Sequence, residues 1–231
     1  MSFDHYPLLD DGSLGAGYFS NWAEFRRAAL AAGVPAWICL QVVGYRGHRH
    51  PSAAEILWQA NVALANGAKG MMYFTYWTME SPDNFTPALI DLQGRPTPTY
   101  DSAIRINREV SVMGAHLRPL RSERVACTGI PAPAGLETFS PDRWVADVAG
   151  DPVILAQFSP ESGGAGEHWL LLTTLSPGEP ANVDLRFGEA VTAVAELDPD
   201  LGRLAHVPGG GRSGLRCNLA AGAARVYRLQ A

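Results

Sequence analysis

Two uninterrupted apolar runs and the helical pattern between them dominate the first half of the chain. The runs are AWICLQVVG at 36–44 and GMMYFTYWT at 70–78, and LWQANVALANGA at 57–68 repeats apolar residues at helical spacing. Fully buried parallel strands appear in sequence as continuous apolar runs, so this pattern predicts a strand, a helix and a second parallel strand. Ligands of such units lie at the carboxyl ends of the strands.

Weaker local signals extend this pattern to three βα units. A first strand is predicted at 3–9, where Pro7 interrupts a short apolar run. Helix boundaries follow from capping patterns and stop signals. The expected helices run from Asn21, with Glu24 three residues on, to Gly33; from Ser52, with Glu55, to Gly67; and from Thr97 and Pro98 to about Leu117.

From Arg124 onward the period of the pattern changes. Nine short apolar runs follow at spacings near ten residues, separated by Gly, Pro, Asp and Ser. This pattern is typical of an antiparallel β-sandwich, and it places a boundary near Ser122 between an α/β unit at 1–122 and an all-β unit at 123–231. The glycine-rich loop PGGGRSG at 208–214 lies between two such runs, which favours a hairpin turn over a phosphate-binding loop.

Composition excludes several classes of protein. The formal net charge of -5 gives no broad basic surface for nucleic acid, and no apolar run reaches the length needed to span a membrane. We see no pattern of a signal peptide, no cofactor motif and no indication of the compartment. Cys39, Cys127 and Cys217 are odd in number, so free thiols are expected, although Cys127 and Cys217 are a candidate pair.

Polar and aromatic side chains gather where the three predicted strands end. Exposed aromatic rings at this edge are suited to stacking on the C–H faces of sugar rings, and polar groups there can hydrogen-bond sugar hydroxyls. The alternatives are core packing for the aromatic residues and satisfied strand-end polar groups for the others. The candidate ligand-binding residues are Asp4, His5, Tyr6, Gln41, Tyr45, Tyr73, Tyr76 and Trp77.

Two carboxylates and two histidines complete the candidate chemistry. Glu80 and Asp83 follow the third strand and are the only carboxylates there that could act as a catalytic nucleophile, although a solvated loop explains them better. His48 and His50 have the i, i+2 spacing of metal ligands, but no third ligand stands near them in sequence. We therefore predict no metal site.

Several of these segments resemble a known family. The segments FDHYP at 3–7, ICLQVVG at 38–44, the stretch from Arg49 to Trp77 and the tail from Gly94 to Ser122 are similar to the C-terminal part of (β/α)8-barrel glycoside hydrolases of clan A, especially family 42 β-galactosidase-like proteins. The resemblance implies a partial TIM barrel, made of the last three βα units, followed by a β-sandwich. The first five units of the barrel would be missing.

The resemblance also implies a carbohydrate ligand and incomplete catalytic machinery. These hydrolases use two carboxyl groups. In the family the acid/base follows the fourth strand, which this chain would lack, and the nucleophile is a glutamate at the end of the seventh strand. Gln41 stands at that position here, so we expect no hydrolysis by the chain alone. Glu80 is a weak candidate for a catalytic role, and no other residue is assigned one.

The same picture predicts association. Three strands of a barrel have two unpaired edges and a face, formed by residues such as Ile38, Leu40, Met72 and Phe74, that is partly bare. We expect a homo-oligomer or docking onto a missing N-terminal barrel half. The alternative function is a non-catalytic module that binds a glycan or a partner domain.

Overall fold

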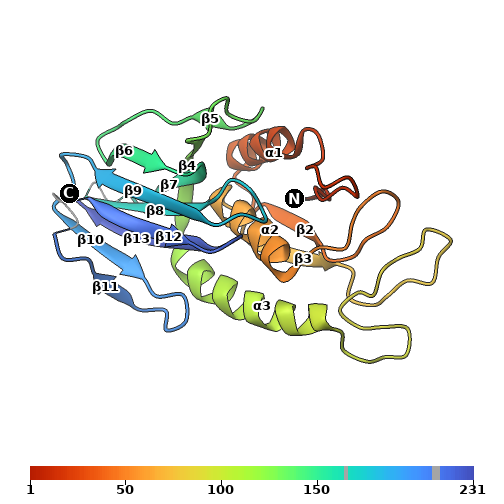
Figure 1. Cartoon of the computed structure of the whole chain (residues 1–231). Coiled ribbons are helices and arrows are strands. Elements are labelled where there is room, and N and C mark those ends of the chain that lie inside the picture. Colours follow the sequence, from red (N-terminus) through yellow and green to blue (C-terminus); the bar gives the residue numbers. More distant parts are fainter. Residues whose placement is uncertain (164–165, 210–213) are drawn as a thin grey trace.

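The computed structural model describes residues 1–163, 166–209 and 214–231. Three helices lie beside a small parallel sheet, and a larger group of antiparallel strands follows (Figure 1). The predicted hairpin turn at 208–214 lies largely outside the described residues. No helix in the described part of the chain is long and apolar enough to cross a membrane.

The first half contains three parallel strands in the order β1-β2-β3. Their order and direction agree with the three predicted βα units. The sheet does not close into a barrel, and its origin as part of one stays a prediction. The elements are β1 (Ser2–Asp4), α1 (Tyr18–Ala32), β2 (Trp37–Gln41), α2 (Ala53–Ala65), β3 (Gly70–Phe74) and α3 (Pro98–Leu117).

The first strand and first helix differ from the sequence prediction. β1 ends at Asp4, well before the predicted limit, and α1 begins at Tyr18 after Gly17, which has a φ of 79°. The predicted capping box of Asn21 and Glu24 is therefore wrong. Tyr18, Phe19 and Trp22 at the start of α1 are buried, so packing against the core extends the helix toward its N-terminus.

The second helix is capped at its N-terminus and hydrogen-bonded to the β half along its length. The predicted capping box is confirmed: Ser52 Oγ accepts from the Glu55 amide at 3.3 Å, and Glu55 Oε2 accepts from the Ser52 amide at 2.8 Å. Trp58 Nε1 donates to the carbonyl oxygen of Thr174 at 3.0 Å, and Asn61 Nδ2 donates to that of Gly222 at 2.8 Å. α2 is therefore a central helix that also contacts the β half.

The third helix has its predicted boundaries. Thr97 is the N-cap residue and Pro98 is the first helical residue. The Thr97 hydroxyl makes no capping hydrogen bond, because it donates to the carbonyl oxygen of Ala88. This bond fixes the loop before α3 to the start of the helix.

The second half consists of strands, and each of the nine predicted runs contains one. The two-residue strand β5, which pairs in parallel with β4, has no signal in the sequence. One sheet has the order β11-β10-β13-β8-β7-β4-β5 and the other the order β12-β9-β6. The strands are β4 (Leu120–Cys127), β5 (Glu137–Thr138), β6 (Val145–Gly150), β7 (Val153–Pro160), β8 (Glu167–Thr174), β9 (Ala181–Phe187), β10 (Ala193–Leu197), β11 (Leu204–His206), β12 (Leu215–Leu219) and β13 (Ala224–Gln230).

Strands β7 and β8 separate two hydrophobic cores. Ile154 and Leu171 pack with the helices, whereas Leu155 and Leu170 pack with the smaller antiparallel sheet. Successive side chains of a strand point to opposite faces, so burial on both faces explains why these two segments are apolar throughout. The first core contains residues from both sides of Ser122, and the domain boundary there stays a prediction. All three cysteines are free thiols, as expected.

One face of the parallel sheet carries no helix. Ile38 and Leu40 are each 1% exposed and pack with the helices, so their assignment to the bare face is wrong. Because successive side chains of a strand point to opposite faces, Trp37 and Cys39 point away from the helices. Trp37 is 41% exposed and Met72 is 39% exposed, and Met72 pairs in register with Cys39. We call these three residues the open face.

Candidate functional site

The carboxyl ends of the parallel strands carry a cluster of aromatic rings. Tyr6, which follows β1, stacks on Phe74 at the end of β3 with a centroid separation of 4.9 Å. Tyr45, which follows β2, stacks on Phe85 at 4.8 Å and 10°. Tyr45 also lies 5.2 Å from the ring of His48. The three strand ends therefore converge on one packed group, as expected for parallel strands.

A tight turn after β2 joins this cluster to the loop after β3. Arg46 and Gly47 both have positive φ, at 43° and 84°, and the backbones of Tyr45 and His48 pair across them. Arg46 reaches Asp83 in an ion pair of 2.6 Å. Thr86 accepts a hydrogen bond from the Gly44 amide at 2.8 Å. These contacts fix the two loops to each other.

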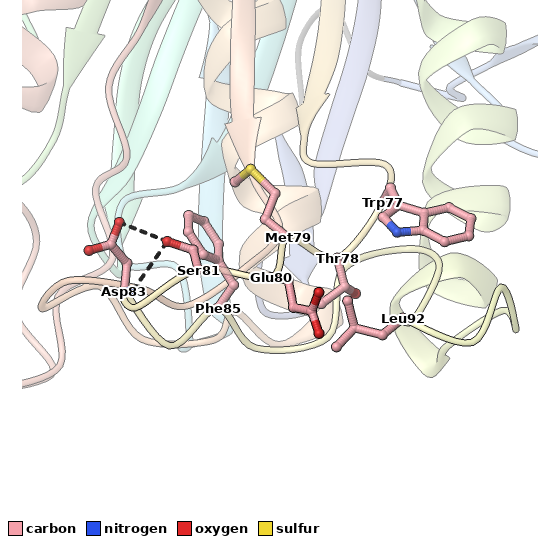
Figure 2. A pocket seen from close by; sticks show the side chains of 8 residues that line it. All are labelled: Trp77, Thr78, Met79, Glu80, Ser81, Asp83, Phe85 and Leu92. Atoms are coloured by element: carbon pink, nitrogen blue, oxygen red, sulfur yellow. Dashed lines mark hydrogen bonds between the residues drawn. The ribbon is translucent and has the colours of Figure 1, made fainter.

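The loop after β3 encloses a surface cavity of about 600 Å³ (Figure 2). Figure 2 shows Trp77 at one side of the cavity and Asp83 at the other, with Glu80 between them in this view. Tyr76 and Trp77 are 59% and 49% exposed, a large apolar surface to leave in water. The lining residues are Trp77, Thr78, Met79, Glu80, Ser81, Asp83, Phe85 and Leu92.

The cavity wall is anchored by Thr78. Its hydroxyl donates to the carbonyl oxygen of Ile90 at 2.7 Å and accepts from the amide of Ala88 at 2.8 Å. The ring of Trp77 lies next to Gly94, where a Cβ would be 3.6 Å from it. The exposed ring is therefore supported by a fixed backbone beneath it.

The two carboxylates of the cavity differ in their partners. Asp83 is bound by Arg46 and accepts a hydrogen bond from the Ser81 hydroxyl at 3.2 Å. Glu80 is exposed, and the described residues give it no hydrogen bond or ion pair. A hydrolytic site needs two carboxyl groups acting on one bond, and here only Glu80 is unengaged.

Gln41 is fully buried, with 0% of its surface exposed. Its side-chain Oε1 accepts from the Leu8 amide at 3.0 Å, and Nε2 donates to the carbonyl oxygen of Arg49 at 2.9 Å and to that of Leu8 at 3.2 Å. This geometry is that of a polar residue that closes a strand end through backbone hydrogen bonds, which was the alternative to a ligand-binding role.

Asp4, His5 and Tyr6, at the end of β1, have different neighbours. His5 Nδ1 accepts a hydrogen bond from Asn21 Nδ2 at 2.6 Å, and burial lowers the pKa of this imidazole, helped by nearby His48. Burial and the carboxylate of Asp4 raise the pKa of Tyr6. Asp4 itself is exposed. Tyr6 therefore belongs to the aromatic cluster, and His5 is held against α1.

Tyr73 lies apart from the other aromatic candidates on β3. It pairs in register with Leu40, packs with the helices, and donates from its hydroxyl to Asn107 Oδ1 of α3 at 2.9 Å. Burial raises the pKa of Tyr73 to about 12. Trp77 lines the cavity and Tyr76 is the exposed residue next to it in the chain, so the structure separates Tyr73 from both.

The histidines of the turn face different partners. His50 Nδ1 lies 2.7 Å from the hydroxyl of Thr86 and its Nε2 lies 3.3 Å from that of Thr99. His48 packs against Tyr6 and Tyr45. Within the part of the chain that the structure describes, no three His, Cys, Asp or Glu side chains are placed to hold a metal ion.

Sequence reasoning missed Phe85, Thr86 and the contact between Arg46 and Asp83. The two charged residues are 37 positions apart, and no local pattern marks them as partners. Phe85 lies in a loop without periodicity, between Asn84 and Thr86. Only the aromatic residue itself, in an otherwise polar segment, was a possible signal.

Comparisons with known proteins show a distant likeness to solved structures but no match to a family model or a curated sequence. Among solved structures, the chain is similar to a proposed alpha-N-acetylgalactosaminidase from Bacillus halodurans C-125, a glycoside hydrolase, with a TM-score of 0.39 and 10% identity. The alignment covers 80% of this chain and 33% of that protein, so the chain spans about a third of that protein's length.

Proposed function

We propose that this chain is a carbohydrate-binding protein of the glycoside hydrolase type whose sugar site is the cavity beside Tyr76 and Trp77. The observation that carries the proposal is the exposure of these two neighbouring rings, 59% and 49%, at the carboxyl end of a parallel strand. Exposed aromatic faces bind the C–H faces of sugar rings. Glu80, free of other partners among the described residues, is placed to accept hydrogen bonds from sugar hydroxyls.

We further propose that the chain binds without cleaving. Retaining hydrolysis requires two carboxyl groups about 5 Å apart, one as acid and one as nucleophile. Asp83 is engaged in an ion pair with Arg46, and Gln41 offers a neutral amide that is buried among backbone groups. Glu80 alone supplies one of the two groups. The resemblance to family 42 β-galactosidase-like proteins makes galactosides the first ligands to test.

Isothermal titration calorimetry tests this proposal directly. The intact chain is titrated with galacto-oligosaccharides and other neutral oligosaccharides, and each titrated sample is then assayed for released reducing sugar. We expect saturable binding that Trp77→Ala abolishes. Trp37→Ala is the matched control, because Trp37 is 41% exposed but lies at the opposite ends of the strands. Absence of binding, or equal loss in both variants, would contradict the site, and release of sugar would contradict the lack of cleavage.

A second candidate function, interaction with another domain, is favoured by the open face. Trp37 and Met72 are both partly exposed there, and no strand in the described part of the chain pairs with the outer edges of β1 and β3. We propose that a second copy of the chain covers this face when no other partner is present. Sedimentation velocity over a range of concentrations should show a dimer that Met72→Lys dissociates. A single monomeric species at all concentrations would contradict this proposal.

A further inference from the structure

A second cavity, of about 670 Å³, lies at the opposite ends of the parallel strands. Four cationic side chains from three segments line it: Arg26 of α1, Lys69 before β3, and Arg118 and Arg121 where α3 leads into β4. Among the described residues that line it, Glu161 is the one carboxylate. The chain as a whole has a net charge of -5, so this basic cavity is a local reversal of sign.

Arg26 is held in place by two hydrogen bonds to Ser122. Its Nε donates to Ser122 Oγ at 2.8 Å and its Nη2 donates to the Ser122 carbonyl oxygen at 2.6 Å. The guanidinium is partly buried, and no described carboxylate forms an ion pair with it. Burial lowers the pKa of Arg26. The carboxylates of Glu137 and Glu123 oppose this effect of burial on the pKa from a distance, without direct contact. A bound anion would give the partly desolvated guanidinium the direct counter-ion that it lacks.

Lys69 removes an obstacle to anion binding. The C-terminal end of a helix carries partial negative charge, which repels anions. Here the Lys69 ammonium donates to the carbonyl oxygens of Arg118 and Leu120 at 2.7 and 2.6 Å, at the end of α3. Its contact with Glu161 is longer, 3.7 Å, and the Glu161 side chain is 60% exposed, so this carboxylate is free to turn toward water. Arg121 forms an ion pair of 3.8 Å with Glu123, but both side chains are largely exposed, so a bound anion can replace this contact. Arg26 and Arg118 form no ion pair among the described residues.

We propose that the basic cavity binds a small ligand bearing a phosphate group. Guanidinium groups present planar pairs of N–H donors that match the oxygens of phosphate, and three of them converge here from α1, the end of α3 and β4. The fixed Arg26 orients the group, whereas the exposed Arg118 and Arg121 close over it. This site is separate from the proposed sugar site, which lies at the other ends of the strands, and it does not depend on it.

Calorimetric titration of the intact chain with inorganic phosphate at low ionic strength tests the proposal. We expect saturable binding that sodium chloride of equal ionic strength does not reproduce. Arg118→Gln and Arg121→Gln should each raise the dissociation constant for phosphate about three-fold, the size expected for the loss of one exposed charge. Both side chains are exposed, so these variants are expected to fold.

Arg27→Gln is the matched control. Arg27 is an exposed arginine next to Arg26 in α1 but does not line the basic cavity. Its replacement removes the same charge and should leave phosphate binding unchanged. The proposal is overturned if phosphate gives no saturable heat, if chloride gives the same response, or if Arg27→Gln weakens binding as much as Arg121→Gln.

Discussion

The side chain of Gln59 satisfies both backbone polar groups of Gln41. Gln59 Oε1 accepts from the Gln41 amide at 2.8 Å, and Gln59 Nε2 donates to the Gln41 carbonyl oxygen at 3.0 Å. Gln59 is 1% exposed and lies in the middle of α2, whereas Gln41 is the last residue of β2. A buried side chain of the central helix thus replaces the strand partner that the end of β2 would otherwise need.

Replacing Gln59 by leucine tests this relationship. Gln59→Leu leaves the Gln41 amide and carbonyl buried without partners, which should lower the free energy of unfolding by about 3 kcal/mol. Urea denaturation followed by circular dichroism measures the change. Gln93→Leu, at an exposed position, is the control and should cost little. Equal stability of the two variants would show that the end of β2 is satisfied in another way.

Replacing Gln41 by glutamate tests whether this position holds a lost nucleophile. A carboxylate there would face the carbonyl oxygens of Leu8 and Arg49 without solvent. We therefore expect Gln41→Glu to lose about 3 kcal/mol of stability and to gain no hydrolysis of aryl β-galactosides. Gln93→Glu provides the exposed comparison. Turnover by a stable Gln41→Glu protein would refute our account of this residue.

Gly222 is a point of close contact between the β half and α2. It has a φ of 72°, and a Cβ added to it would overlap the carbonyl oxygen of Ala54. Gly222→Ala should therefore cost about 3 kcal/mol or more in thermal or urea unfolding. Gly12→Ala is the control, because Gly12 also has positive φ, at 84°, but nothing lies within 4 Å of such a Cβ. It should cost about 1 kcal/mol. A similar loss in both variants would mean that strain alone, without the contact, sets the cost.

His168 should make stability depend on pH. It is 6% exposed, stacks on Trp144 at 4.6 Å and lies 3.1 Å from Gln157 Oε1. Burial lowers the pKa of His168 from 6.5 to about 4. The unfolded chain therefore binds a proton at higher pH than the folded chain, and stability falls as the pH drops from about 6.5 to about 4.

The expected loss from this residue is about 2 kcal/mol, because the site is not completely closed to solvent. Urea unfolding of the original chain and of His168→Gln at several pH values separates the contribution of His168 from that of the carboxylates that titrate in the same range. The variant should show a flatter pH dependence, whereas His206→Gln, at an exposed position, should match the original chain. An unchanged profile in His168→Gln would contradict the prediction.

The sequence predicted the elements wherever the signal was local. The capping box of Ser52 and Glu55 marked the start of α2, and the apolar runs marked both parallel strands. It failed at α1, whose start depends on burial of Tyr18 and Trp22, a tertiary effect. Nothing in the sequence showed that the short segment of β5 would pair with β4.

The faces of the parallel strands could not be predicted. In AWICLQVVG both alternating sets of residues are apolar apart from Gln41, so the run does not show that Ile38 and Leu40 face the helices while Trp37 and Cys39 do not. Because of the same ambiguity, the sequence prediction placed Tyr73 and Trp77 in one site. The hydrogen bond from Tyr73 to Asn107 shows that the Tyr73 side chain points toward α3, and this contact between distant segments has no local signal.

Indole NMR on the intact chain labelled with ¹⁵N-tryptophan tests the central claim most directly. Resonances are assigned with Trp77→Phe and Trp37→Phe, and a galacto-oligosaccharide is then added. We predict that the Trp77 indole signal shifts progressively with ligand and that the Trp37 signal, from the opposite ends of the strands, stays in place. A shift confined to Trp37, or no shift at any ligand concentration, would contradict a sugar site beside Tyr76 and Trp77.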